Sequence, residues 1–167
     1  MVSDPREELC RLYQFRCGYC GTSEVDVGAA LTIDHFQPRS RGGADAPANW
    51  VYCCHACNEF TGEYWQPDSL HRILHPLYDD LSTCIVEEAD GRLRGLTETG
   101  TFHMQRLQLN RPQLVAHRLA RRIDAEVRCA LAAGQQEGAA GLQRLAELEE
   151  ALQVALQRLV QIVRRSR

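Results

Sequence analysis

The feature that most constrains the fold of this chain is a pair of cysteine knuckles lying far apart in the sequence. Cys17-x-x-Cys20 and Cys54-x-x-Cys57 together supply four thiolates, the number that a tetrahedral structural zinc ion takes. Four cysteines buried for unrelated reasons would rarely fall into two such pairs. We expect Cys54 rather than Cys53 to be the ligand, because only Cys54 has the two-residue spacing to Cys57.

The compartment and the other cysteines are interpreted from composition. The N-terminus MVSDPREELC has no apolar stretch typical of an export signal, so a cytoplasmic location is expected. In the cytosol, closely spaced cysteines more often bind metal than form disulfides. Cys10, Cys84 and Cys129 are isolated and are predicted to be small buried hydrophobic residues. No apolar run is long enough for a membrane span.

The pattern of apolar residues, glycines and prolines predicts an α+β fold. Strands are expected at 30–36 and 50–52, and a hairpin at 84–88 and 92–96 whose turn contains Asp90-Gly91. Helices are expected at 6–15, 55–62, 101–109, 112–133 and 142–165, with a break from Gly134 to Gly141.

The last predicted helix carries apolar residues at alternating spacings of three and four, which is typical of a helix–helix seam. They are Leu145, Leu148, Leu152, Ala155, Leu159 and Ile162. A helical hairpin formed within the chain is favoured over a dimerising coiled coil, because about three heptads is marginal for an independent coiled coil. A homodimer or a protein partner through these C-terminal helices stays open.

The 33 residues between the knuckles exceed what a simple zinc ribbon needs. They contain DHFQPRSRGG at 34–43 and NW at 49–50, and the second knuckle continues as CHACN at 54–58. With CGYC at 17–20, these pieces resemble the zinc-stapled branch of the HNH endonuclease family. Residues 63–119 bear a weaker resemblance to the tail of some bacterial HNH proteins.

The resemblance implies a ββα-metal core, of the HNH or His-Me finger type, at residues 1–62. An extension at 63–110 would pack on that core, and a C-terminal helical hairpin would occupy 111–167. It further implies that Asp34 and Asn58 bind a catalytic divalent cation, that His35 is the general base, and that Asn49 holds the loop. The four cysteines would hold structural zinc away from the chemistry.

Elementary chemistry agrees with these roles. Hydrolysis of a phosphodiester builds negative charge that a divalent cation offsets, and the oxygen ligands of Asp34 and Asn58 suit Mg²⁺ or Mn²⁺. Histidine titrates near neutrality, so His35 can accept a proton from water. Neighbouring side chains on a strand point to opposite faces, so Asp34 and His35 share one site only at a strand end or edge.

Each of these residues also has an ordinary interpretation. An Asp-His pair is common, Asn49 suits a turn, and Asn58 suits a helix surface; their joint placement between two knuckles favours the nuclease site. Two positions depart from the family pattern. Thr61 stands where many relatives carry a lysine, and Asn58 replaces the last histidine.

The distribution of charge gives a hypothesis for DNA contact. Residues 1–100 carry a net charge of −8 and residues 101–167 a net charge of +5, and every basic residue is arginine. Arg39 and Arg41 flank the turn and are predicted to meet the phosphate backbone beside the cut site, and Arg118 and Arg122 share a helix face. The wider predicted surface comprises Arg106, Arg111, Arg118, Arg121, Arg122 and Arg128. A solvated helix face is the competing interpretation.

The sequence therefore predicts a metal-dependent endonuclease acting on DNA, with RNA left open as a substrate. Two rivals are a non-catalytic zinc-stapled DNA-binding module and an interaction protein that uses the C-terminal helices. His71, His75 and His103 are expected to be structural.

Overall fold

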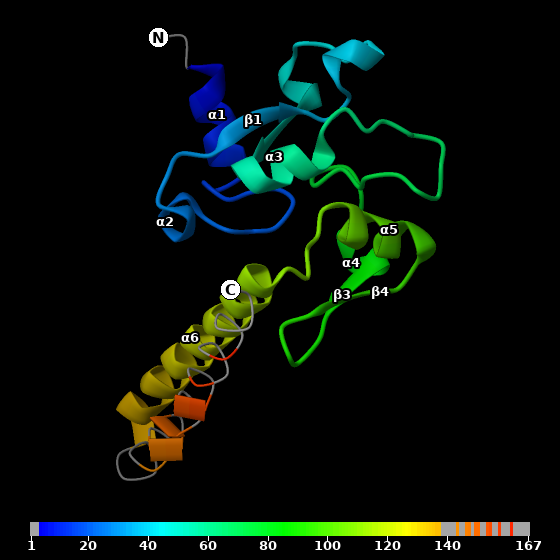
Figure 1. Cartoon of the computed structure of the whole chain (residues 1–167). Coiled ribbons are helices and arrows are strands. Elements are labelled where there is room, and N and C mark those ends of the chain that lie inside the picture. The colour runs from blue at the N-terminus through cyan, green and yellow to red at the C-terminus, as the bar shows by residue number, and fades with distance from the viewer. Residues whose placement is uncertain are drawn as a thin grey trace. The chain divides into compact units, whose positions relative to one another are not determined.

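The computed structural model describes residues 4–137 and isolated positions between 143 and 161. The chain forms two compact units (Figure 1). One comprises Met1–Glu88 with Leu93–Asn110, and the other Ala89–Arg92 with Arg111–Arg167. Within the described residues, no helix has the length and apolar character needed to cross a bilayer. The seam predicted from Leu145 to Ile162 lies outside the described residues.

The first helix, α1 (Pro5–Leu12), begins where the sequence predicts. The Asp4 side chain accepts a hydrogen bond from the Arg6 N–H, and Pro5 occupies the first turn. The helix ends three residues earlier than expected, because Gln14 and Phe15 adopt left-handed backbone conformations with φ of 53° and 56°. This turn directs the chain into the first cysteine knuckle.

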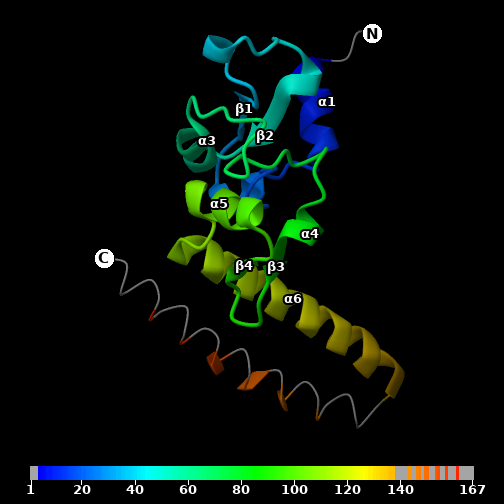
Figure 2. The ribbon, with the colours of Figure 1, turned by 90° about the vertical axis from the view of Figure 1, so that its right-hand side faces the viewer.

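The centre of the first unit is a ββα arrangement. Strand β1 (Thr32–His35) pairs antiparallel with β2 (Trp50–Cys53), so that Asp34 lies opposite Val51 and His35 opposite Trp50. Helix α3 (His55–Thr61) follows β2 directly and lies beside the hairpin (Figure 2). The predicted α+β class is therefore confirmed, including its ββα core.

Short elements connect these parts of the core. Helix α2 (Glu24–Val27), absent from the prediction, begins with a capping box in which Ser23 and Asp26 satisfy each other's backbone N–H groups. The connection between β1 and β2 holds two 3₁₀ turns, η1 (Arg39–Arg41) and η2 (Pro47–Asn49). Both turns lie within the loop that joins the two strands.

The rest of the first unit comprises α4 (Leu81–Cys84), the hairpin β3 (Ile85–Glu87) and β4 (Leu93–Gly95), and α5 (Glu98–Arg106). The hairpin is as predicted, whereas α5 begins three residues early. Thr97 is the reason: its hydroxyl accepts a hydrogen bond from the Gly100 N–H and caps the helix. A Cβ at Gly100 would lie 2.0 Å from the Cys84 carbonyl oxygen, so only glycine allows this approach.

The core of the first unit contains residues of β2 together with residues from the segments around Leu74 and Leu107. Its most deeply buried side chains include Val51, Tyr52, Cys53, Leu74 and Leu107. His103 belongs to the same core at 0% exposure, and its Nδ1 accepts a hydrogen bond from the Leu74 N–H. His75 is buried as well, which fits a structural role for both histidines.

The second unit is built on α6 (Pro112–Glu137). The predicted break at Gly134 is wrong, because the helix continues through it. Glycine costs about 1 kcal/mol in a helix interior, and the neighbouring Ala, Leu, Gln and Glu residues are good helix formers that offset this cost. Cys129 is exposed on this helix, so its predicted burial is also wrong.

Arg118 corrects a further expectation. Its side chain is 4% exposed and its Nε donates a 2.6 Å hydrogen bond to the Gly91 carbonyl oxygen. Gly91 has a φ of +78°, and a Cβ there would lie 2.8 Å from Leu119 Cγ. Arg118 thus holds the 89–92 turn against α6, and it does not present its guanidinium to DNA as predicted.

The burial of His103 generates a prediction about acid stability. Desolvation lowers the pKa of His103 from 6.5 to about 4. The unfolded chain takes up a proton near pH 6.5, so the contribution of the neutral ring is complete above that pH and is lost as the pH falls towards 4. The difference between the two pKa values corresponds to about 3 kcal/mol of unfolding free energy.

A His103→Asn variant, whose amide oxygen can still accept from Leu74, should be less stable near neutrality but should lose less stability on acidification. Urea unfolding of both proteins from about pH 7 to about pH 4 measures this. His71→Asn, at a side chain that is exposed, is the control. Equal pH dependence in the wild type and the His103 variant would contradict the prediction.

Candidate functional site

Four thiols gather where the first knuckle meets the start of α3. The Sγ atoms of Cys17, Cys20, Cys54 and Cys57 all lie within 4.8 Å of one another, and those of Cys20 and Cys54 are 3.7 Å apart. A tetrahedral site with Zn–S bonds of about 2.3 Å has S···S edges of about 3.8 Å. All four cysteines are free, so the donor set fits a zinc ion, and the predicted cluster is confirmed.

Local structure explains why these thiols converge. The Gly21 backbone, with a φ of +76°, turns the chain after the first pair. The Gly18 N–H donates to the Tyr52 carbonyl oxygen and fixes the knuckle to β2. Cys54 is the N-cap of α3 and Cys57 lies one turn further along the helix, so β2 delivers the second pair directly to the first.

Hydrogen bonding among the four clustered thiols shifts their pKa values in opposite directions. Hydrogen bonding with Cys17 lowers the pKa of Cys20 to about 7, and the same kind of contact holds the pKa of Cys54 far below its ordinary value. Burial instead raises the pKa of Cys53, which lies outside the cluster. Hydrogen bonding within the cluster raises the pKa of the other two thiols, Cys17 and Cys57, so thiolate is favoured at Cys20 and Cys54 within the group of four.

Asp34 on β1 faces the C-terminal end of α3. The Thr61 hydroxyl oxygen lies 2.8 Å from both Asp34 Oδ2 and the Asn58 carbonyl oxygen, and its single O–H is shared between these two acceptors. Burial raises the pKa of the Asp34 carboxyl group, while the hydrogen bond from Thr61 opposes that rise. Thr61 therefore joins the strand and the helix that carry the two expected metal ligands, Asp34 and Asn58.

Thr61 occupies the position where the family resemblance predicts a lysine. A different basic side chain, that of Arg106, contacts Thr61 from another helix. Arg106 on α5 donates from a terminal guanidinium nitrogen to the Thr61 carbonyl oxygen at 3.2 Å. Its guanidinium also lies 5.1 Å from the centre of the Tyr64 ring. The sequence placed Arg106 on a broad basic surface, and its contact with α3 was not foreseen.

His35 lies at the end of β1, in contact with the loop that follows. Its Nε2 is 2.9 Å from Asp45 Oδ1 and 3.2 Å from Arg39 Nε. One ring nitrogen cannot donate to Asp45 and accept from Arg39 at the same time. A bond between an N–H and a carboxylate is the stronger of the two, so we assign the proton to Nε2, and Nδ1 is then the basic nitrogen.

Asp45 is the centre of this small network and was missed by the sequence analysis. Its carboxylate also accepts hydrogen bonds from the Arg39 guanidinium at 2.7 Å and from the Trp50 indole N–H at 3.2 Å. Hydrogen bonding from Arg39, followed by that from His35, lowers the pKa of Asp45 to about 2. The carboxylate therefore stays ionised beside His35 throughout the physiological range.

Asn49 closes the loop that carries Asp45. Its Oδ1 accepts from the Gln37 N–H at 2.8 Å, and its Nδ2 donates to the carbonyl oxygens of Gln37 and Ala44 at 3.0 and 2.9 Å. A Cβ at Gly43 would lie 1.8 Å from the Gln37 oxygen, so glycine is required there. This is the geometry that a loop-holding role for Asn49 requires.

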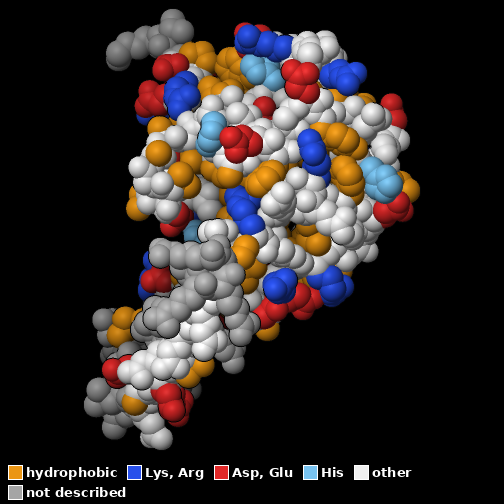
Figure 3. All heavy atoms as spheres, viewed as in Figure 1, with side chains coloured by type: hydrophobic (Ala, Val, Ile, Leu, Met, Phe, Trp, Pro, Cys, Tyr) orange, Lys and Arg blue, Asp and Glu red, His pale blue; other side chains and the backbone are white. Residues whose placement is uncertain are grey.

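The arginines expected to contact DNA have different environments. Arg39 and Arg41 are exposed on η1, Arg122 is half-buried on α6, and Arg118 is buried. On the face drawn in Figure 3, basic and acidic side chains are interspersed and do not form one basic patch. On this face, a nucleic-acid contact would therefore depend on individual arginines.

Comparison with known proteins agrees with this geometry. Residues 17–62 match the family model described as HNH endonuclease. The match begins at the first clustered cysteine and ends just after α3. No curated protein and no solved structure matches the chain.

The cysteine cluster generates a prediction with a matched pair of variants. Cys54→Ala should lose zinc and lower the melting temperature, because small zinc-stapled units fold with their metal. Cys53→Ala removes a neighbouring buried thiol outside the cluster and should keep zinc. The zinc content of the purified proteins measures the difference, and circular dichroism before and after chelation measures the effect on folding.

Zinc loss in both variants, or in neither, would contradict the assignment of Cys54. Unchanged circular dichroism and melting after the wild type has been stripped of zinc would contradict the structural role of the metal.

Proposed function

Because residues 17–62 carry an HNH endonuclease domain, we propose that this chain is a metal-dependent endonuclease that hydrolyses phosphodiester bonds in DNA. The observation that carries the proposal is the pairing of His35 with an ionised Asp45, at the residue that follows Asp34 on β1. A module that only binds DNA has no need of an oriented base next to a carboxylate.

The residues that would hold the catalytic cation are Asp34 and Asn58. Their oxygen atoms suit Mg²⁺ or Mn²⁺, and the bound cation would offset the negative charge that develops on the phosphate during hydrolysis. Asp34 comes from β1 and Asn58 from α3, and the Thr61 hydroxyl fixes the separation of the two elements.

The protein's own residues supply the proton transfer. Nδ1 of His35 accepts a proton from the attacking water, and Nε2–H donates to Asp45 as the ring becomes positively charged. Asp45 fixes the tautomer and stabilises the imidazolium, as the buried carboxylate does in a catalytic triad. Asn49 keeps the loop closed so that Asp45 stays within reach.

The remaining groups bind rather than react. The four clustered cysteines hold structural zinc away from the scissile phosphate. Arg39, Arg41 and Arg122 are proposed to contact the phosphate backbone, whereas the burial of Arg118 removes it from this set.

The experiment that tests the function is plasmid cleavage in Mg²⁺ or Mn²⁺ by the wild type, His35→Ala and His55→Ala. His35→Ala should lower the cleavage rate by about a hundredfold or more, since general-base catalysis contributes 10²–10⁴-fold. His55 is 84% exposed on α3 and pairs only with Glu59 among the ion pairs of the described residues, so His55→Ala should cut normally.

If the folded, zinc-loaded wild type cuts neither DNA nor RNA, the non-catalytic binding module becomes the better account. Cutting that survives His35→Ala would remove His35 as the base.

A second prediction concerns Asp45. Asp45→Asn should lower the cleavage rate by roughly tenfold to a hundredfold, less than in a buried triad because this carboxylate is exposed to solvent. Since Asp45 acts through His35, the double variant with His35→Ala should be no slower than His35→Ala alone. Additive losses in this cycle would assign Asp45 a role independent of His35.

A further inference from the structure

A small aromatic pocket lies next to the candidate catalytic strand and has no part in the chemistry described above. It encloses about 350 Å³ of space, including its open mouth. Its lining comes from the residue after β1 and from the segment after α3: Phe36, Tyr64, Trp65, Gln66, Pro67, Arg72 and Ile73.

Phe36 connects the pocket to the candidate metal site. Side chains two residues apart on a strand point to the same face about 7 Å from each other, so Phe36 and Asp34 share a face. The Phe36 N–H donates to the Asn49 carbonyl oxygen at 2.8 Å, which extends the strand ladder by one rung beyond His35. The pocket-wall residue Phe36 and two of the candidate catalytic residues, Asp34 and His35, thus lie within three consecutive residues of the chain.

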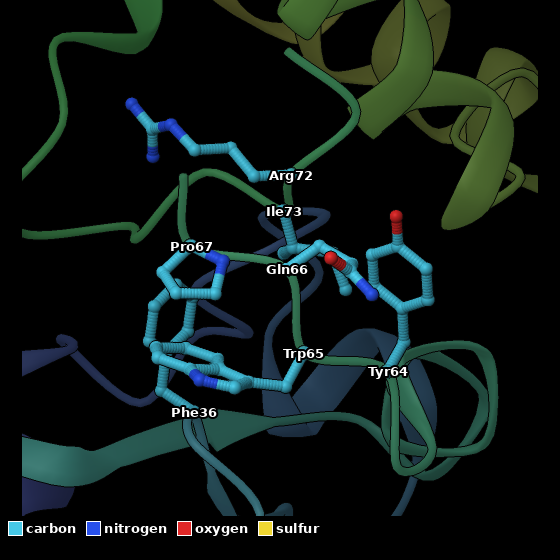
Figure 4. Close-up of a pocket in the computed structure, with 7 residues that line it drawn as sticks. All are labelled: Phe36, Tyr64, Trp65, Gln66, Pro67, Arg72 and Ile73. Atoms are coloured by element: carbon cyan, nitrogen blue, oxygen red, sulfur yellow. The ribbon is translucent and has the colours of Figure 1, made fainter. Parts of the chain in front are cut away.

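One ring in the pocket, that of Trp65, leaves surface for a flat occupant. Trp65 meets Phe36 edge to face, with ring centres 5.6 Å apart and planes at 87°. Phe36 also meets the His75 ring at 4.5 Å, and the Tyr64 ring lies against Phe102 and the Arg106 guanidinium. The flat surface left for an occupant is therefore that of Trp65, whose one ring contact among the described residues is with Phe36. Figure 4 shows Phe36 and Trp65 on one side of the pocket and Tyr64 on the other side of Gln66. Trp65 is only half-buried, as expected for a surface on which a planar ring can stack.

The charge of the pocket favours a neutral ring over a phosphate or a carboxylate. Arg72 is its one charged lining residue, and both terminal nitrogens of its guanidinium are held by Asp79 at 2.8 and 2.7 Å. The guanidinium extends away from the aromatic rings in Figure 4. The exposed Gln66 amide offers both a donor and an acceptor, which suits the edge of a nucleobase.

We propose that this pocket binds one unpaired nucleobase of the substrate beside the scissile phosphate. The inference deepens the proposed nuclease function and rests on it. Aromatic side chains hold unpaired bases by stacking, whereas a base within a duplex must first leave the stack. The chain therefore prefers single-stranded or locally unpaired DNA over a continuous duplex.

The test measures binding without cleavage, using the full chain with His35→Ala, loaded with zinc and in the presence of Mg²⁺. Fluorescence anisotropy follows a labelled single-stranded oligonucleotide and, separately, the same oligonucleotide annealed into a fully paired duplex. Adding Trp65→Ala should weaken single-strand binding by about tenfold, since one stacked base contributes that order of affinity. Duplex binding should stay the same.

Trp65→Phe keeps an aromatic face and should retain most of the single-strand affinity, which separates stacking from a packing defect. Zinc content and melting temperature are measured for each variant to establish that it is folded. Single-strand binding that is unaffected by Trp65→Ala in the folded protein would overturn the proposal. So would an equal loss for single strand and duplex.

Parallel cleavage assays separate this inference from the proposed function. If cleavage requires His35 but single-strand binding does not depend on Trp65, the nuclease function is supported and base binding in the pocket is rejected. If the wild type does not cut but single-strand binding requires Trp65, the nuclease function is rejected and base binding in the pocket is supported.

Discussion

The convergence of four thiols is the constraint on which the ββα core depends. A two-stranded hairpin is marginally stable by itself in water, and β1 with β2 is such a hairpin. The cysteine cluster joins the first knuckle to the junction between β2 and α3. It thereby fixes the angle at which α3 leaves the sheet, and with it the separation of Asp34 from the helix end that carries Thr61. Zinc binding and formation of the proposed catalytic geometry would consequently be one folding event.

The parts of this arrangement that follow from local spacing could be predicted from the sequence. Two-residue spacing selects Cys54 over Cys53, and the cluster agrees. The positions of β1, β2 and α3 follow from short apolar stretches that are bounded by glycine, proline or cysteine residues. Turn chemistry at Asp90-Gly91 likewise indicated the second hairpin. In each case the determining residues are close neighbours in the chain.

Contacts made across a loop could not be predicted in the same way. Asp45 reaches His35 only because Asn49 and Gly43 close the intervening loop on Gln37, and nothing in residues 36–48 taken singly specifies that closure. The prediction that Arg118 contacts DNA was wrong for a related reason. Helical spacing predicts which side chains share a face, but it does not say that a carbonyl group from residue 91 lies against that face.

Side chains alternate in direction along a strand, which constrains how an Asp-His pair can share one site, and the end of β1 is where this constraint is relieved. Neighbouring side chains on a strand point to opposite faces, so an Asp34–His35 pair in mid-strand could not serve one phosphate. The ladder ends one rung beyond His35, where the Phe36 N–H meets the Asn49 carbonyl oxygen. The chain then turns into the loop that carries Asp45, and the imidazole stands at the boundary between sheet and loop. There it is held by Asp45 from the loop, while Asp34 is held by Thr61 from the helix. The two side chains are thus fixed independently at the same strand end, as a shared site on one substrate requires.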